Sequence, residues 1–264
     1  MLLKAEGIGV KLKKENQKKL FGNEKQEILK DAYIDLNKGE CVGIIGESGS
    51  GKSTFGKVLV GLLKPNSGKV LINGIDTYGK NNKENKINLK QTISIVFQDY
   101  TSSVNPRFKV KDVINEALII KERNSRKKIN KEENIKELLK QVGLSENIIN
   151  RYPHELSGGQ LQRVCIARAI AIEPQIILLD EAISSLDASI QTQIMDLLLE
   201  LKRKYNLSYI FITHDLTAVT YMCDKVLFLN NGRVVEKVDD ISKLALVSNE
   251  YAKKLLNSVM IIDY

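Results

Sequence analysis

The chain has 264 residues, 43% hydrophobic and 27% charged, a composition that can bury a full core and remain soluble. The net charge of +8 suits a nucleic acid, an anionic membrane surface or a phosphate ligand, although solvated lysine-rich faces explain it as simply. With no Trp and 6% aromatic residues, the composition argues against an aromatic cage or a base-stacking surface.

The cysteines and the apolar runs limit the function classes further. Cys41, Cys165 and Cys223 are isolated in apolar settings, which predicts buried packing thiols rather than a metal cluster. The N-terminus lacks the long apolar core of a signal peptide, and no apolar run reaches the ~18 residues of a membrane span. If the protein serves a membrane, we expect it to dock to other chains.

Predicted strands and helices alternate along the chain. Apolar or alternating runs predict strands at 28–36, 41–45, 70–74, 92–97, 176–179, 209–213 and 226–229. Helical spacing predicts helices at 53–63, 110–143 with a charged interruption at 121–131, 161–172 and 190–205. The polar stretch 81–88 predicts an exposed loop, and Asn230-Asn231-Gly232 predicts a hairpin turn after which 233–235 pair back.

This order predicts an α/β fold with a largely parallel sheet and helices on both faces. The hairpins near the start and the end of the chain add an antiparallel β piece. Residues 111–165 carry no strand signal, so they look like a helical insertion into the α/β core.

A glycine-rich loop matches the pattern G-x-x-x-x-G-K-[ST] between a predicted strand and a predicted helix. Its residues are Gly46, Glu47, Ser48, Gly49, Ser50, Gly51, Lys52, Ser53 and Thr54. Glycines let the backbone curl so that N–H groups point at phosphate oxygens, and the following helix turns its N-terminus to the same anion. Lys52 can reach the β- and γ-phosphates, and the Ser53 hydroxyl can ligate Mg²⁺. A chance Gly/Ser turn lacks this context, so the sequence predicts a nucleoside triphosphate site.

Two later motifs narrow the chemistry. The segment Leu156-Ser157-Gly158-Gly159-Gln160 precedes a helix expected to begin near Leu161, and Ser-Gly-Gly at a helix start forms a second anion-binding platform. The strand 176–179 ends in Asp180 and Glu181, which strand alternation would point in different directions. Asp180 can then join a Mg²⁺ shell while Glu181 faces the attacking water as general base. Either motif alone also fits an ordinary capped helix or turn.

With these motifs in this order, the chain resembles the nucleotide-binding subunits of ATP-binding cassette (ABC) transporters from about Leu2 to Glu236. The resemblance implies a P-loop NTPase fold with a mostly parallel core sheet, an antiparallel β subdomain and an inserted helical subdomain at about 105–170. The nucleotide-binding domain would span 1–236, followed by a short C-terminal tail, 237–264.

The resemblance also assigns roles to single residues. Gln98 resembles the glutamine that senses Mg²⁺ and the transmembrane partner, and His214 resembles the switch histidine at the γ-phosphate. Ser53, Gln98 and Asp180 would hold the Mg²⁺ of Mg-ATP, with Glu181, His214 and Gln98 catalytic. Asp187 belongs to a segment, 184–187, that resembles the loop communicating between subunits. An upstream aromatic would stack on adenine: Phe21 is the first candidate, and Tyr33 the second, although its strand-like setting favours packing.

Such subunits work as head-to-tail dimers, so ATP would lie between one phosphate loop and the partner's platform at 157–160. The implied partners are a second ATPase subunit, in this branch a paralogue, two transmembrane permease subunits and an extracytoplasmic substrate-binding protein. The chain would then act as a peripheral subunit on the cytoplasmic face of the cell membrane.

The cargo depends on finer resemblances. Segments 97–107, 151–160 and 189–193 resemble the peptide and nickel importer branch. Three features favour nickel or another metal-chelate cargo: the helix 160–168, Ala182 where most members have Pro, and no longer tail with clustered cysteines. Import of oligopeptides or dipeptides is the alternative.

A nucleic-acid-associated ABC ATPase is the remote alternative. Its repair and chromosome-organising members carry a long coiled coil before the signature, for which 111–150 is too short. The basic stretch 123–131 is followed by Glu132, Glu133 and Glu137, a pattern typical of a solvated helix face. We therefore expect no nucleic-acid partner.

Overall fold

The computed structural model describes residues 1–13, 25–79, 92–125 and 127–260, with side chains to Ser258. The chain forms two compact units. Residues 1–82 and 210–264 make the first unit, and residues 83–209 make the second. The predicted loop at 81–88 lies outside the described residues.

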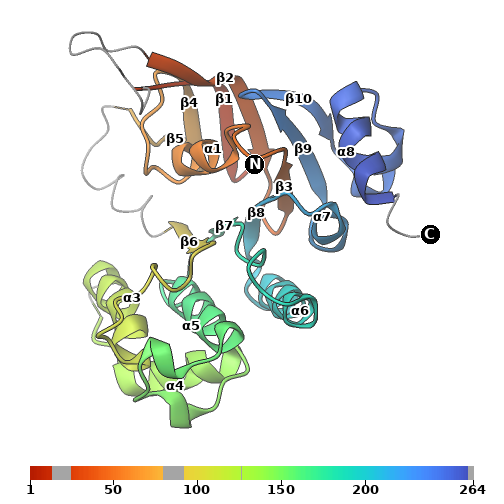
Figure 1. Cartoon of the computed structure of the whole chain (residues 1–264). Helices are drawn as coiled ribbons and strands as arrows, with labels where there is room; N and C mark the ends of the chain where they lie inside the picture. The colour runs from red at the N-terminus through yellow and green to blue at the C-terminus, as the bar shows by residue number, and fades with distance from the viewer. Residues whose placement is uncertain (14–24, 80–91, 126, 261–264) are drawn as a thin grey trace, which may run out of the picture. The chain divides into compact units, whose positions relative to one another are not determined.

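An antiparallel sheet begins the first unit (Figure 1). Its strands, in spatial order, are β2 (Lys25–Leu36), β1 (Leu3–Lys13), β4 (Ser67–Ile72) and β5 (Ile75–Asp76). The sequence pattern did not predict β1, because its hydrophobic alternation is interrupted at Gly7 and Gly9. Leu3, Ala5 and Ile8 on β1 are buried, so the strand still contributes to the core.

The first unit also holds the strands that carry the glycine-rich loop. β3 (Cys41–Ile45) is buried along its whole length and pairs in parallel with β9 (Lys225–Asn230). β10 (Arg233–Val238) pairs back on β9 through Asn231 and Gly232, both of which have positive φ, so the predicted hairpin is confirmed. β8 (Ser208–Thr213) begins in the second unit and ends in the first.

The described residues of the first unit also form helical segments. They are α1 (Lys52–Leu59), α7 (Leu216–Met222), the 3₁₀ turn η3 (Ile241–Leu246) and α8 (Glu250–Met260). α1 ends earlier than predicted, and Gly61 then takes a positive φ of 81° that a helix cannot continue through. α8 packs against α7 and β10. The sequence pattern predicted neither α7 nor α8.

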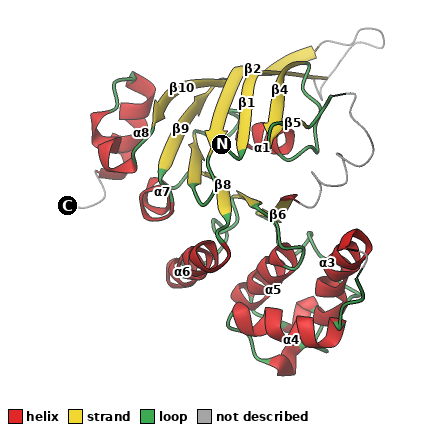
Figure 2. Cartoon of the chain, turned by 180° about the vertical axis from the view of Figure 1, so that it is seen from behind, coloured by secondary structure: helices red, strands yellow, loops and turns green. Residues whose placement is uncertain are grey.

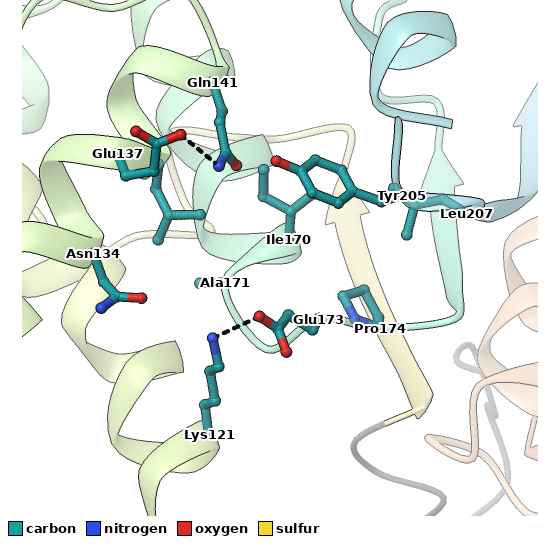
Figure 3. Close-up of a pocket in the computed structure, with 11 residues that line it drawn as sticks. Lys121, Asn134, Glu137, Gln141, Ile170, Ala171, Glu173, Pro174, Tyr205 and Leu207 are labelled. Atoms are coloured by element: carbon teal, nitrogen blue, oxygen red, sulfur yellow. Dashed lines mark hydrogen bonds and ion pairs between the residues drawn. The ribbon is translucent and has the colours of Figure 1, made fainter. Parts of the chain in front are cut away.

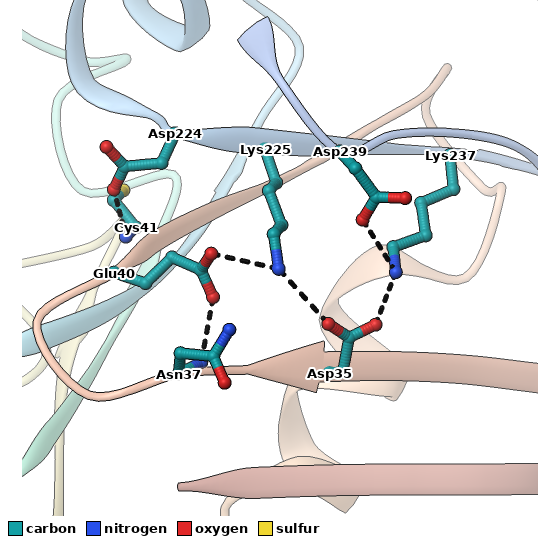
Figure 4. A network of polar contacts seen from close by, with 8 residues as sticks. All are labelled: Asp35, Asn37, Glu40, Cys41, Asp224, Lys225, Lys237 and Asp239. Atoms are coloured by element: carbon teal, nitrogen blue, oxygen red, sulfur yellow. Dashed lines mark hydrogen bonds and ion pairs between the residues drawn. The ribbon is translucent and has the colours of Figure 1, made fainter. Parts of the chain in front are cut away.

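A polar network ties β2 to the β9–β10 hairpin (Figure 4). Lys225 bridges Asp35 at 3.2 Å and Glu40 at 2.9 Å, and Lys237 bridges Asp35 and Asp239. Burial would raise the pKa of Asp35, but the hydrogen bonds from Lys237 and Lys225 outweigh it, so the pKa lies below its usual value. Asp35 is therefore held as a carboxylate between two ammonium groups.

The second unit contains a pair of parallel strands and a group of helices (Figure 2). β6 (Ile93–Phe97) pairs with β7 (Ile176–Asp180) from Ile93 opposite Ile176 to Phe97 opposite Asp180. The helices are α3 (Val110–Ser125), α4 (Lys131–Gln141), α5 (Gly158–Ile170) and α6 (Ala188–Tyr205), with 3₁₀ turns η1 (Glu146–Ile148) and η2 (Pro153–Glu155). α3, α4 and α5 pack on one another.

The expected helical insertion is confirmed: the described residues between 111 and 165 form helices and turns without a strand. The charged interruption predicted at 121–131 separates α3 from α4, where the Asn130 side chain caps the second helix by accepting from the Glu133 N–H. All three cysteines are buried free thiols, as predicted, with the Sγ atoms of Cys41 and Cys223 3.5 Å apart. Within the described residues, no helix is long and apolar enough to cross a membrane.

Candidate functional site

The glycine-rich loop leaves β3 and is fixed to the β9–β10 hairpin. A Cβ on Gly46 would lie 2.2 Å from the carbonyl oxygen of Leu229, so that position admits glycine alone. The N–H of Gly232 donates to the Ser50 carbonyl at 3.0 Å, and Gly51 takes a φ of 105° that L side chains rarely adopt. The loop conformation is therefore set by its neighbours in the first unit.

The Lys52 ammonium group is folded over this loop. It is 5% exposed and donates to the carbonyl oxygens of Gly46 at 2.7 Å and Glu47 at 3.0 Å. α1 begins at the same residue, with no side-chain cap at Gly51 and no acidic residue in its first turn. A helix N-terminus without a cap beside a buried cation suits an anion, so the residues present fit the phosphates of ATP.

His214 lies at the end of β8, in the same unit as the loop, and its side chain is exposed. The next residue, Asp215, caps α7 by accepting from the N–H groups of Thr217 at 2.8 Å and Ala218 at 3.3 Å. Its own N–H donates to the Thr213 hydroxyl at 3.0 Å. These bonds fix the backbone on both sides of the imidazole.

In the second unit, the ends of β6 and β7 bring three predicted residues to one edge. Because Phe97 pairs with Asp180 in parallel strands, Gln98 and Glu181 both follow the sheet at its carboxyl edge. The Gln98 Nε2 donates to the Ser184 hydroxyl at 3.5 Å, and that hydroxyl donates to the Glu181 carbonyl at 3.0 Å. Gln98, Asp180 and Glu181 therefore lie together.

Glu181 departs from the predicted geometry. β7 ends at Asp180, and Glu181 has a φ of 48°, in the left-handed region. Strand alternation therefore does not set the directions of the two carboxylates, contrary to our expectation. A non-glycine residue in this region costs of order 1–3 kcal/mol, and such strain concentrates at functional sites.

The segment after Gln98 is held by Asp99. Its carboxylate accepts from the Thr101 hydroxyl at 2.6 Å and from the N–H groups of Thr101 and Ser102 at 3.1 and 2.9 Å. The Thr101 hydroxyl and the Ser102 N–H lower the pKa of Asp99 to about 2. The ionised Asp99 carboxylate, through these hydrogen bonds, fixes the backbone path after Gln98.

The Ser-Gly-Gly-Gln platform is a capping box at the start of α5. The Ser157 hydroxyl accepts from the Gln160 N–H at 3.3 Å, and the Ser157 N–H donates to the Gln160 side chain at 3.1 Å. The helix therefore begins at Gly158, three residues before the predicted start. A Cβ on Gly158 would lie 2.7 Å from the Tyr100 hydroxyl, and one on Gly159 would lie 3.0 Å from Ile190.

The remaining predicted residues are placed as follows. Asp187 stands at the N-cap position of α6 with its side chain exposed and not capping the helix. Phe21 lies outside the described residues. Tyr33 is on β2 and 40% exposed, so it is not one of the buried core side chains. Alternation of side chains along β2 places Tyr33 on the solvent-exposed face of the strand. An apolar run in the sequence does not by itself show which face a given side chain occupies.

The second unit also has a cavity of about 290 Å³ between α3, α4 and the ends of α5 and α6 (Figure 3). A Lys121–Glu173 ion pair of 2.8 Å and a Gln141–Glu137 hydrogen bond of 3.1 Å cross its wall. No predicted site residue lines this cavity. It therefore adds nothing to the nucleotide chemistry considered above.

Sequence comparisons point to one family. A family model described as ABC transporter matches residues 29–184. The oligopeptide transport ATP-binding protein OppF of Bacillus subtilis is 40% identical over 235 residues, which cover 88% of this chain and 76% of OppF. The metal-staphylopine import system ATP-binding protein CntF of Staphylococcus aureus is 42% identical over 237 residues, covering 90% of this chain and 92% of CntF.

Solved structures agree with the sequence relatives. The dimeric post-hydrolysis state of the ATP-binding cassette MJ0796 bound to ADP and Pi is 29% identical, with a TM-score of 0.76 over 89% of this chain and 97% of that chain. The structure of cbiO1 from Clostridium perfringens, part of the ABC transporter complex cbiONQ, is 28% identical, with a TM-score of 0.74 over 99% and 96%.

Proposed function

The chain belongs to the ATP-binding cassettes of ABC transporters, and on that premise we propose that it is the ATP-hydrolysing subunit of an importer for a transition metal bound to a small organic chelator. Members of this family are ATPases, and among the relatives named above OppF is an oligopeptide transport ATP-binding protein and CntF belongs to a metal-staphylopine import system. The observation that carries the cargo proposal is the extent of the match to CntF, which at 42% identity covers 92% of CntF, whereas OppF of Salmonella typhimurium at the same identity is covered to 68%.

Each predicted site residue has a separate role in ATP hydrolysis. In the reaction, the γ-phosphoryl group of Mg-ATP is transferred to water and ADP is released. The N–H groups at the start of α1 and the Lys52 ammonium would bind the phosphates. By resemblance, the Ser53 hydroxyl and the Asp180 carboxylate would each be a ligand of the Mg²⁺ ion. Glu181 takes the proton of the attacking water on its carboxylate, which is the role of a general base.

Gln98 and His214 have the two further roles that the family resemblance implies. The Gln98 amide would join the Mg²⁺ shell, and through Ser184 it is bonded to the main chain at Glu181. The imidazole of His214 is exposed and would contact the terminal phosphate. By resemblance, Phe21, which lies outside the described residues, would stack on adenine, and a partner's residues 157–160 and Asp187 would close over the nucleotide in the dimer.

The same premise implies a set of partners. We infer a second ATPase subunit, a paralogue of this chain, two transmembrane permease subunits and an extracytoplasmic substrate-binding protein. The chain then sits as a peripheral subunit on the cytoplasmic face of the membrane. Cargo selection belongs to the other subunits, so the residues described here act on ATP alone.

Import of peptides is the second candidate, because OppF of B. subtilis and OppF of Salmonella typhimurium are 40% and 42% identical to this chain. Ala182 favours the metal-chelate cargo, because most members of the branch have Pro at this position. In the structure Ala182 is buried directly after Glu181.

Uptake by cells that lack the chain separates the two cargoes. We expect accumulation of nickel, cobalt or zinc, supplied with a chelator, to fall and to return when the wild-type chain is restored, with uptake of a labelled oligopeptide unchanged. If peptide uptake is lost while metal accumulation stays normal, the metal-chelate proposal is wrong and the chain serves a peptide importer. ATP hydrolysis by the chain that is stimulated by DNA or RNA, and not by its membrane partners, would contradict both.

A further inference from the structure

The last helix of the chain reaches the phosphate loop. The hydroxyl of Tyr251, in the first turn of α8, accepts a hydrogen bond of 2.8 Å from the N–H of Glu47. Glu47, Ser48 and Gly49 form the exposed outer part of the loop. A side chain from the segment after the cassette motifs therefore holds the part of the loop that is most open to solvent.

This contact is linked to Lys52 through a single peptide group. The carbonyl oxygen of Gly46 and the N–H of Glu47 belong to the same planar peptide unit. The Lys52 ammonium donates to that carbonyl at 2.7 Å, while the N–H donates to Tyr251. Because the unit is rigid, fixing one end fixes the orientation of the other.

α8 is itself anchored where it presents Tyr251. The Glu236 carboxylate on β10 accepts from the Ser248 N–H at 3.0 Å and from the Asn249 N–H at 2.5 Å, just before the helix begins. The Asn249 side chain then accepts from the Tyr251 N–H at 2.9 Å. Ala252 is fully buried, and the helix packs on β10 and on α7, the helix that follows His214.

The state of the phenol suits this role. Tyr251 is half-buried, and burial raises its pKa above the ordinary value. The hydroxyl therefore stays protonated at neutral pH and accepts the Glu47 N–H as an uncharged oxygen. The contact does not place a negative charge next to the phosphate loop, where it would oppose an anionic ligand.

We propose that Tyr251 is a positioning residue for the phosphate loop, which holds the Gly46–Glu47 peptide group in the orientation that binds ATP. In its absence the exposed part of the loop samples other conformations, and ATP must order them at the expense of affinity. α8 is thereby linked to the nucleotide site. A change in the position of α8 would therefore change the affinity for ATP.

The first test is Tyr251→Phe, which removes the hydroxyl alone, in the full chain. Ser258→Ala, which removes an exposed hydroxyl from the same helix, is the matched control. Since one hydrogen bond contributes about 0.5–1.5 kcal/mol, we expect the Kd for Mg-ATP in equilibrium binding to rise by about 2- to 10-fold for Tyr251→Phe. The control should bind as the wild type does, and kcat at saturating ATP should stay within about 2-fold.

The second test follows hydrogen exchange without nucleotide. We expect the Glu47 amide to exchange faster in Tyr251→Phe, while the amides of α1 and of 252–258 keep their protection. An unchanged Kd would overturn the proposal. So would faster exchange along all of α8 with the Glu47 amide unaffected, because that result assigns Tyr251 to helix packing alone. Both measurements test the role of Tyr251 whether or not the cargo proposal is correct.

Discussion

The side-chain amide of Gln162 on α5 donates a hydrogen bond of 2.6 Å to the main-chain carbonyl of Ala182, the residue after Glu181. Gln162 is fully buried, four residues after the helix start at Gly158. The helix that carries the Ser-Gly-Gly platform is thus bonded to the backbone that positions the proposed general base. Since Glu181 is in a strained conformation, its neighbours must hold it there.

Gln162→Leu should lower kcat, while it lowers the free energy of unfolding only slightly. The variant leaves the buried Ala182 carbonyl without this donor, but it also removes the Gln162 Oε1, a buried oxygen with no hydrogen-bond partner. We expect a stability loss of about 1 kcal/mol, at the low end for a broken buried hydrogen bond. Steady-state kinetics and urea unfolding measure the two quantities. A normal kcat in a folded variant would show that the bond does not support Glu181.

Glu181→Gln should abolish hydrolysis while ATP still binds. Losing a general base costs about 10²–10⁴-fold in rate, and the amide keeps the shape of the side chain. The rate is measured by phosphate release and the binding by equilibrium titration with Mg-ATP. Glu200→Gln, an exposed carboxylate on α6, is the control and should hydrolyse ATP normally. Near-normal turnover in Glu181→Gln would remove the carboxylate from the mechanism.

The pKa of Asp35, which Lys237 and Lys225 hold below its usual value, predicts an acid-sensitive contribution to stability. A carboxylate with a depressed pKa in the folded state stabilises it above the unfolded pKa of about 4, and this contribution is lost as pH falls through the folded pKa. Asp35→Asn should therefore be less stable than the wild type at pH 7, with the difference shrinking below about pH 4.

Urea unfolding at pH 7 and at pH 3.5 checks this expectation. The control is Glu27→Gln on the same strand, where an exposed carboxylate lies 3.7 Å from Lys11. An exposed pair contributes little, so its effect should be small at both pH values. A difference between Asp35→Asn and the wild type that grows as the pH falls would contradict the assigned direction.

The sequence pattern predicts best where the signal is local. The Gly46–Thr54 motif, the buried run before it and the hairpin at Asn231-Gly232 each combine a short motif with its expected neighbours, and the structure confirms their strands and turn. The break between α3 and α4 is likewise marked by a run of charges and by a capping residue at Asn130. These features depend on neighbours a few residues apart.

What the pattern missed depends on distant contacts. The bond from Glu47 to Tyr251 joins residues 204 positions apart, and no motif marks a tyrosine in a polar C-terminal helix as a partner of the loop. Ser248, Asn249 and Glu250 do form a helix-start signal that would have predicted α8. The left-handed conformation of Glu181, directly after β7, is likewise not encoded by a strand pattern.

Gly158→Ala tests the packing of the platform against Tyr100. In a helix, alanine is ordinarily favoured over glycine by about 0.5–1 kcal/mol, but here the new Cβ would lie 2.7 Å from the Tyr100 hydroxyl and 3.6 Å from its Cζ. The clash is therefore with one oxygen atom. We expect Gly158→Ala to lower the Tm and Gly158→Ala with Tyr100→Phe to restore it.

Gly159→Ala is the control, because its Cβ would lie 3.0 Å from Ile190, whose β-branched side chain is stiff, and not against Tyr100. Adding Tyr100→Phe to Gly159→Ala should therefore restore nothing. If the restored Gly158→Ala, Tyr100→Phe protein regains its Tm but still hydrolyses ATP slowly, Gly158 has a role at the nucleotide beyond packing. Full recovery of both would mean that this glycine is required only to make room for the tyrosine.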